Sequence, residues 1–190
     1  MSEAGLDLEA LLAQRGALLE GHFRLSSGRH SDRFVQKFRL LEDPALLEPV
    51  AEAIAARFRE KEPTLVAGAA VGGILLAYEV ARRLGTRMVF VEKELGVAAL
   101  RRGFVIDPCD RVLVVEDVVT TGLSVREVLG VVRASGAAVV GIGVIVARAT
   151  LDFEVPTYGL LDLPLVSFDP AECPQCRAGV PLTDPGSRRV

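Results

Sequence analysis

The chain has 190 residues, of which 50% are hydrophobic and 25% charged, and its net charge is −3. This apolar content excludes an intrinsically disordered protein, because disordered chains lack the apolar surface needed to offset the entropy of ordering. The length fits one domain, with or without a small appendage. The slight acidic excess does not indicate binding of nucleic acid, which a basic excess would favour.

Cysteine content and hydropathy indicate in which cellular compartment the protein is found. Three cysteines do not make a disulfide framework, which favours a reducing cytosol. The longest apolar run, 139–147, is the length of a strand and too short to span a membrane. The acidic, amphipathic start of the chain lacks the basic and apolar regions of a signal peptide. We therefore expect a cytoplasmic protein that is not inserted in a membrane.

The first forty residues differ in pattern from the rest. Leucines at helical spacing predict a helix over 6–15, and alternating small, polar and aromatic residues predict short strands and a Ser/Gly turn within 17–40. Apolar residues on one face predict a further helix over 44–59. We expect three segments: a helix and hood over 1–40, a core over 41–168 and an irregular tail over 169–190.

Short apolar runs alternate with helical patterns through the core. The expected strands are 64–68, 87–92, 111–116 and 137–148, and the expected helices are 74–85 and 125–136. Strand–turn–helix repeats of this kind predict an α/β fold with a central parallel sheet covered by helices on both faces. The charged, glycine-rich segment 93–103 shows no clear period, so we expect a mobile loop there.

Three loops of this arrangement follow strands of the predicted sheet. They are 68–73, 92–103 and 117–122. Ligands of open α/β sheets bind beyond the carboxyl ends of the strands. We therefore expect the three loops to converge on one site.

The stretch VLVVEDVVTTGLS at 112–124 carries the most chemistry. Glu116 and Asp117 follow an apolar strand, and two adjacent carboxylates suit the hydroxyls of a sugar or a hard cation. An anion site is predicted at the helix N-terminus that comes next, from Thr120, Thr121, Gly122 and Ser124. Taken singly, these features also fit an exposed strand end and a helix cap. In this order they predict a site for ribose 5-phosphate.

This stretch resembles the phosphoribosyl-diphosphate (PRPP) motif of the type I phosphoribosyltransferases. GHFRLSSGRHSDRF at 21–34 resembles the hood of the orotate-specific members, and the tail ECPQCRAGVPLTDPGSR resembles one branch of them. The resemblance covers roughly residues 5–190. It implies transfer of the 5-phosphoribosyl group from PRPP to orotate, giving orotidine 5′-monophosphate and pyrophosphate.

The resemblance also implies roles for individual residues. The implied PRPP-binding residues are Glu116, Asp117, Val118, Val119, Thr120, Thr121, Gly122, Leu123, Ser124, Val71, Gly72, Gly73 and Lys93. The implied orotate-binding residues are Thr120, Arg148, Ser26 and Phe34, with Arg148 matching the position that pairs with the orotate carboxylate through two parallel hydrogen bonds. The implied catalytic residues are Asp117, Glu116, Lys93, Arg101 and Arg102.

Mg²⁺ is the implied cofactor, held mainly through PRPP and not by dedicated protein ligands. In related enzymes the loop corresponding to 93–103 closes over the site and reaches the neighbouring subunit, which implies a homodimer. The alternative for this loop is a solvated, charged segment. The implied partners are the small molecules PRPP and orotate, without nucleic acid or membrane.

The chain departs from better-known bacterial members at three places. Ser26 stands where those members carry a lysine, Val71–Gly72 replaces a Tyr-Lys pair, and the loop 93–103 has no histidine. The catalytic cations therefore have to come from Lys93, Arg101 or Arg102, with Arg29 and Lys37 as further possibilities.

His22 and His30 are the only histidines, and Cys173 and Cys176 form a CxxC pair. Either histidine could contact the base or a phosphate, or be a surface or hydrogen-bonded structural residue. A structural zinc site needs four ligands, and one CxxC supplies two. Three readings of the pair stay open: a zinc ion shared by two subunits, a disulfide, or a structural turn in the tail.

Two further functions compete with orotate transfer. The first is a phosphoribosyltransferase for uracil or a purine, from which the hood segment 21–34 should distinguish this chain. The second is a regulator that senses PRPP and binds nucleic acid. A regulator would need a basic face or an added DNA-binding segment, and the sequence shows neither.

Overall fold

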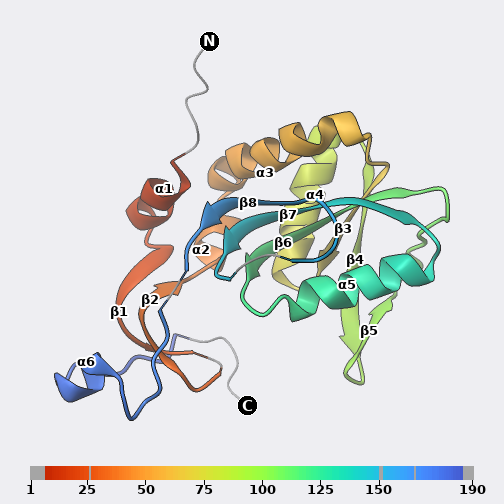
Figure 1. Ribbon diagram of the computed structural model, residues 1–190. Coiled ribbons are helices and arrows are strands. Elements are labelled where there is room, and N and C mark those ends of the chain that lie inside the picture. Colours follow the sequence, from red (N-terminus) through yellow and green to blue (C-terminus); the bar gives the residue numbers. More distant parts are fainter. Residues whose placement is uncertain (1–6, 26, 150–151, 165, 186–190) are drawn as a thin grey trace. The chain divides into compact units, whose positions relative to one another are not determined.

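The computed structural model describes residues 7–25, 27–149, 152–164 and 166–185 (Figure 1). The chain divides into two compact units. The larger lies within 41–163, and the smaller combines 7–40 with the tail from 164 onward. None of the helices in the described ranges is both long and apolar enough to cross a membrane.

The larger unit is built on a six-stranded sheet, as Figure 1 shows. Its strand order is β5-β4-β3-β6-β7-β8, and only the edge strand β5 runs antiparallel to its neighbour. The strands are β3 (Leu65–Ala69), β4 (Arg87–Glu94), β5 (Val97–Leu100), β6 (Arg111–Val119), β7 (Ala138–Ala147) and β8 (Thr157–Asp162). The predicted α/β fold with a central, mostly parallel sheet is confirmed.

Helices cover the two faces of this sheet. They are α3 (Pro44–Phe58), α4 (Gly72–Leu84) and α5 (Leu123–Ala134), and the short 3₁₀ helix η1 (Arg59–Lys61) follows α3. The Asp43 side chain caps α3 by accepting a hydrogen bond from the Ala45 amide at 3.0 Å, and α4 ends at Gly85 in the left-handed conformation. The helix over 44–59 was predicted from its apolar face and the one over 74–85 from its stop at Gly85, and both predictions are confirmed.

The core of the larger unit is aliphatic. From α5, Val125, Val128, Leu129 and Val132 pack against buried valine, leucine and alanine side chains of β3, β4 and β6. On the opposite face α3 lies so close to β7 that a Cβ added at Gly143 would be 2.5 Å from Ile54 Cγ2. Burial of apolar side chains on both faces is the main stabilising contribution to such a unit.

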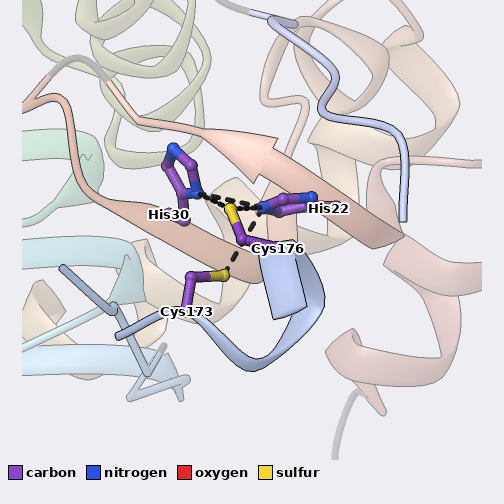
Figure 2. Close-up of side chains that lie close together, drawn as sticks. All are labelled: His22, His30, Cys173 and Cys176. Carbon is purple, nitrogen blue, oxygen red and sulfur yellow. Dashed lines mark hydrogen bonds between the residues drawn. The ribbon is translucent and has the colours of Figure 1, made fainter. Parts of the chain in front are cut away.

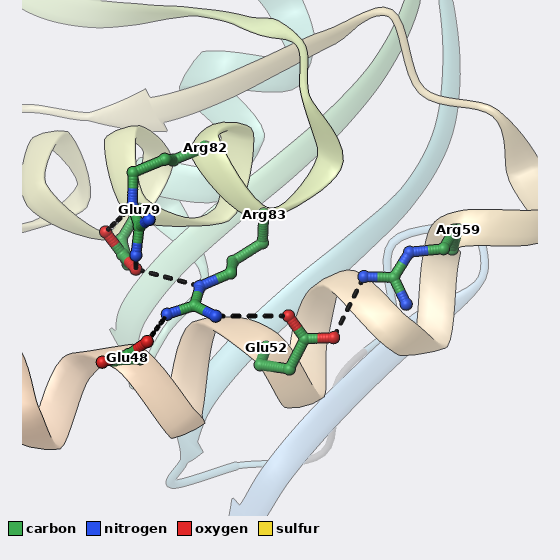
Figure 3. Close-up of polar contacts among 6 residues, drawn as sticks. All are labelled: Glu48, Glu52, Arg59, Glu79, Arg82 and Arg83. Atoms are coloured by element: carbon green, nitrogen blue, oxygen red, sulfur yellow. Dashed lines mark hydrogen bonds and ion pairs between the residues drawn. The ribbon is translucent and has the colours of Figure 1, made fainter.

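A network of charged residues joins α3 to α4 at the surface (Figure 3). Arg83 of α4 pairs with Glu48 and Glu52 of α3, and Glu79 accepts hydrogen bonds from Arg82 and Arg83. The hydrogen bond from Arg82 is the main reason that the pKa of Glu79 is lowered from its ordinary value. Exposed ion pairs contribute little individually, so the network adds to helix packing without replacing it.

The smaller unit contains an antiparallel pair of strands and short helices. Its elements are α1 (Leu8–Gln14), β1 (Leu18–Arg24), β2 (His30–Val35), α2 (Phe38–Leu41, whose last residue belongs to the larger unit) and α6 (Pro174–Arg177). The tail pairs with both strands, because Phe23 bridges to Thr183 and His30 to Phe168. Residues far apart in the sequence therefore form one small structure.

The expectation of a loop over 93–103 was wrong in its first half. β4 continues to Glu94 and pairs with β5, so the segment is a β-hairpin with its turn at Leu95 and Gly96, both at positive φ. Ala98 and Leu100 pack against the aliphatic core, and Phe104 meets Phe90 edge to face. These apolar contacts hold the hairpin to the sheet. The strands were not predicted because charged residues are interspersed among the apolar residues of this segment.

Candidate active site at the carboxyl edge of the sheet

The carboxyl ends of β3, β4, β6 and β7 lie at one edge of the sheet, since these strands run parallel to one another (Figure 1). Ala69 pairs with Val91, and Val119 pairs with Ala147. The loops expected at 68–73 and 117–122, together with the β4–β5 hairpin, therefore begin at a common edge.

Glu116 and Asp117 lie inside β6 and not after it. The strand was expected to end at 116, but the β-branched Val118 and Val119 continue it, and Val118 pairs with Val146 of β7. Both carboxylates are buried, with Glu116 5% and Asp117 1% exposed. Glu116 Oε1 accepts a hydrogen bond from the Asp117 amide at 3.1 Å, and Asp117 Oδ1 accepts one from the Val118 amide at 2.6 Å.

The turn after β6 leads directly into α5. Its N-cap is Gly122, at φ 75°, which has no side chain to accept hydrogen bonds from the first-turn amides. A Cβ at this position would lie 2.8 Å from the ring of Phe153, so glycine is required by both conformation and space. The exposed hydroxyl of Thr121 accepts from the Leu123 amide at 3.4 Å. A helix start whose N-cap residue has no side chain is a suitable site for a phosphate.

The β3–α4 turn contains Ala70 and Val71, joined by a cis peptide bond, and α4 begins at Gly72. Val71 is 70% exposed, whereas Gly72 and Gly73 are buried. Gly68 and Gly73 make the close approach of β3 to α4 possible, since a Cβ on Gly68 would overlap the Gly73 carbonyl. Part of the glycine-rich pattern therefore serves backbone packing, which the sequence analysis had not separated from ligand binding.

Arg148 follows β7 directly. Its backbone amide donates to the Val119 carbonyl at 2.9 Å, which fixes it beside the end of β6. Its side chain is half-buried, and its Nε is buried without a hydrogen-bond acceptor in the described part of the chain. Burial lowers the pKa of the Arg148 guanidinium from its ordinary value. A buried donor without an acceptor is unfavourable, and an anionic ligand would relieve that.

The predicted cations of the hairpin are engaged with acidic side chains. Lys93 Nζ lies 2.8 Å from Glu127 Oε1 of α5, Arg101 pairs with Glu94, and Arg102 binds Glu92 in a bidentate manner at 3.0 and 3.1 Å. Glu127, Glu92 and Glu94 are partners that the sequence analysis did not identify. All three cations lie in the hairpin or at its base, and each would have to exchange its partner to meet a departing anion.

The remaining predicted residues belong to the smaller unit. Ser26 lies outside the described residues. Phe34 of β2 packs against Phe23, with 5.8 Å between ring centroids. Arg29 donates to the Ser167 hydroxyl and carbonyl at 2.9 and 2.6 Å, and the Lys37 ammonium lies 5.6 Å from the centre of the Phe38 ring.

The sequence analysis missed one cluster in the smaller unit. His22 and His30 are buried and adjacent to Cys173 and Cys176 of the tail (Figure 2). All three cysteines are free thiols, so the structure does not have the disulfide that was one of the open readings. The available signal was that the only two histidines accompany a CxxC pair in the same chain.

The comparisons agree with this architecture. No protein-family model matches the chain. The chain is 50% identical over 186 residues to orotate phosphoribosyltransferase of Pelotomaculum thermopropionicum, covering 97% of this chain and 98% of that protein. It is 48% identical over 183 residues to the Thermotoga maritima enzyme of the same name, with 95% and 98% covered. The crystal structure of orotate phosphoribosyltransferase from Aeropyrum pernix superposes with a TM-score of 0.68 at 30% identity, covering 81% of this chain and 92% of that one.

The sheet, its order and its loops are those of a type I phosphoribosyltransferase. About half of the residues are identical to those of these two enzymes over nearly the full length of both chains. This level of identity shows the family and not the fold alone. The chain belongs to the orotate phosphoribosyltransferase family.

Proposed function

We propose that the protein transfers the 5-phosphoribosyl group of PRPP to orotate, releasing orotidine 5′-monophosphate and pyrophosphate. The observation that carries the proposal is the juxtaposition, at one sheet edge, of a buried acid pair, an uncapped glycine helix start and Arg148. The Arg148 amide is bonded to the last residue of β6, three residues before Gly122. Carboxylates for a sugar, amides for its phosphate and a guanidinium for a carboxylate are the groups that this pair of substrates requires.

In this proposal Glu116 and Asp117 bind the ribose hydroxyls and favour the positive charge that develops on the ring as pyrophosphate leaves. The amides of Thr120 to Ser124 hold the 5-phosphate. Val118 and Val119, the last residues of β6, position this turn beside the ligand. Arg148, with Thr120, binds orotate. No covalent enzyme intermediate is needed, so catalysis consists of positioning and electrostatic stabilisation.

Pyrophosphate needs positive charge as it departs. The Val71–Gly73 backbone offers amides, and Lys93, Arg101 and Arg102 offer cations once they exchange their glutamate partners for the anion. That exchange would make the β4–β5 hairpin respond to substrate, which fits a segment that closes to exclude water.

Two buried carboxylates are hard oxygen donors, which fit a Mg²⁺ bound mainly through PRPP. When bound, this ion supplies charge that stabilises the leaving group. Glu116 and Asp117 are the residues that would contact the metal-bound sugar.

We also propose a homodimer. Val71, the N-cap of α4, is 70% exposed, and Leu75 and Tyr78 on this helix are 45% and 62% exposed. The three follow helical spacing, and Leu95 at the hairpin tip is fully exposed. An apolar stripe of this kind supports burial against a second copy of the chain. Sedimentation equilibrium should give twice the chain mass, and a monomer at micromolar concentration would contradict this assembly.

The three free thiols support a location in the reducing cytoplasm, and a net charge of −3 supports small-molecule ligands over nucleic acid.

The function is tested with a panel of bases. Purified protein, PRPP and Mg²⁺ are incubated with orotate, uracil, adenine or hypoxanthine, and pyrophosphate release is measured. We expect release with orotate alone. Turnover of another base would leave the phosphoribosyl site in place and refute the orotate assignment. Absence of turnover with every base, together with no heat of PRPP binding, would refute the site itself.

A further inference from the structure

Four potential metal ligands meet at one point of the smaller unit (Figure 2). His22 comes from β1, and His30 begins β2. Cys173 is the N-cap of α6, and Cys176 lies within this helix. Their ligand atoms all lie within 4.8 Å of one another. His22 and Cys173 are 151 residues apart in the sequence, so the cluster exists only because the tail returns to the strands.

Most of the distances between the ligand atoms are close to those of a tetrahedral metal centre. His22 Nε2 lies 3.0 Å from His30 Nδ1, 3.5 Å from Cys173 Sγ and 3.6 Å from Cys176 Sγ, and Cys176 Sγ lies 3.3 Å from His30 Nδ1. Tetrahedral bonds of the lengths that zinc makes with nitrogen and sulfur separate the ligand atoms by about 3.3 to 3.8 Å. The three nitrogen–sulfur distances, 3.3, 3.5 and 3.6 Å, fall within this range, and the His22–His30 distance of 3.0 Å is slightly shorter.

Hydrogen bonding alone does not explain this arrangement. His22 Nδ1 lies 2.8 Å from the Val180 carbonyl, which can only accept, so Nδ1 carries the hydrogen. In neutral His22 the lone pair is then on Nε2, which faces His30 and both thiols. One lone pair accepts one good hydrogen bond, yet three polar groups approach it. The Val180 contact is also the outer hydrogen bond that typically orients a metal-binding histidine.

The surroundings are organised to hold the cluster. Thr183 donates its amide to the His22 carbonyl at 2.7 Å, and Gln175 Nε2 donates to the Gly21 carbonyl at 2.8 Å. His30 and Phe168 exchange backbone hydrogen bonds at 2.9 and 2.8 Å. Three of the ligands are buried, and Cys176 is exposed, which leaves a route by which a metal can enter.

We propose that His22, His30, Cys173 and Cys176 bind one Zn²⁺ and form a structural zinc site within a single chain. Two thiolates and two neutral imidazoles balance the dication, so the buried centre carries no net charge. Four protein ligands leave no open position for a substrate, which distinguishes this site from a catalytic zinc. The ion fastens the tail to β1 and β2 and holds both ends of the turn between the two histidines.

The proposal differs from the zinc reading that the sequence left open. That reading needed a second subunit, since CxxC supplies only two ligands. In the structure the other two ligands come from the same chain. The zinc site does not depend on the proposed transferase activity, and metal content is its readout.

Metal analysis tests the site directly. The full chain, produced without a polyhistidine tag, is dialysed and analysed by inductively coupled plasma mass spectrometry. We expect one zinc per chain in the wild type and in Cys109→Ser, whose thiol is exposed and outside the cluster. Cys176→Ser should lose the zinc, and circular dichroism checks that this variant is folded. Full zinc in Cys176→Ser, or a metal-free wild type with Cys173 and Cys176 joined in a disulfide, would overturn the proposal.

Cobalt substitution tests the site in the wild-type chain, so the result does not depend on whether a cysteine variant folds. Replacing the metal of the wild-type chain with Co²⁺ should produce the visible absorption bands of a tetrahedral ion together with sulfur-to-cobalt charge transfer. The same spectrum is expected from Cys109→Ser. Octahedral Co²⁺ bands without charge transfer in the wild type would refute coordination by the two cysteines.

Discussion

In the larger unit the buried side chains of the described residues are aliphatic or aromatic apart from Asp110, Glu116 and Asp117, whereas the smaller unit buries two histidines, a serine and a cysteine. The larger unit has a sheet with helices on both faces, which buries enough apolar surface for stability. The smaller unit has two paired strands and a few short elements. A small structure with little apolar core commonly depends on a metal or disulfide. The difference explains why ligand-type residues occur inside the smaller unit.

Removing the proposed zinc from the smaller unit should have the largest effect among the changes that test this difference. Prolonged dialysis against a chelator should lower the thermal midpoint of the wild type by roughly 10 °C, since a structural zinc contributes folding free energy and about 1 kcal/mol shifts a chain of this size by a few degrees. Differential scanning calorimetry measures the shift, and added Zn²⁺ should reverse it. Cys176→Ser is the control, since a chain already lacking the metal should not respond. Equal midpoints with and without chelator in the wild type would remove the contrast between the units.

Asp117→Asn separates function from stability in the larger unit. Loss of the carboxylate removes charge that favours the developing positive ribose ring, so kcat/KM for PRPP should fall by about 100- to 1000-fold. Steady-state kinetics measure the fall, and circular dichroism should show a wild-type fold. Asp152→Asn, an exposed carboxylate of the same unit, should retain activity. Wild-type turnover in Asp117→Asn would show that the buried acid pair is structural only.

Arg148→Ala tests base recognition. Removing the proposed charge-assisted contact with the orotate carboxylate should raise KM for orotate by about 10- to 100-fold, with a much smaller change in KM for PRPP. Initial rates over both substrate concentrations measure the two constants. The exposed Arg133 provides the matched variant Arg133→Ala, which should leave both constants unchanged. A similar rise in both constants for Arg148→Ala would argue against a carboxylate contact.

Gly141→Ala and Gly130→Ala test how closely the helices pack on the sheet of the larger unit. They have the smallest expected effects. A Cβ at Gly141 would overlap the ring of Phe58, so this variant should lose about 1 to 3 kcal/mol of unfolding free energy. Gly130 lies exposed in α5 with no neighbour near an added Cβ, so alanine there should stabilise by about 0.5 to 1 kcal/mol. Urea unfolding measures both. If Gly141→Ala lost no stability, close packing of α3 on β7 would not limit the stability of this unit.

Local patterns predicted most of the larger unit. Periodicity located α3, α4, α5 and the strands β3, β4, β6 and β7 to within a few residues, because apolar spacing and helix stop signals depend on residues that are close in sequence. β8 was not expected, since 157–162 mixes polar and apolar residues and pairs only with β7. The β4–β5 hairpin was also missed, because its charged residues resemble those of a loop and its apolar contacts are made across the chain.

The sequence by itself determined the α/β class, the acid pair with the glycine turn that follows it and the relationship to orotate phosphoribosyltransferases, because each depends on residues close together in the chain. Only the tertiary structure decided the surroundings of Arg148 and the meeting of two histidines with two distant cysteines. Those contacts depend on strand pairing and on the return of the tail through Phe168 and Thr183. The spacing of apolar residues describes only neighbouring positions in the chain. It therefore carries no information about which distant segments pair.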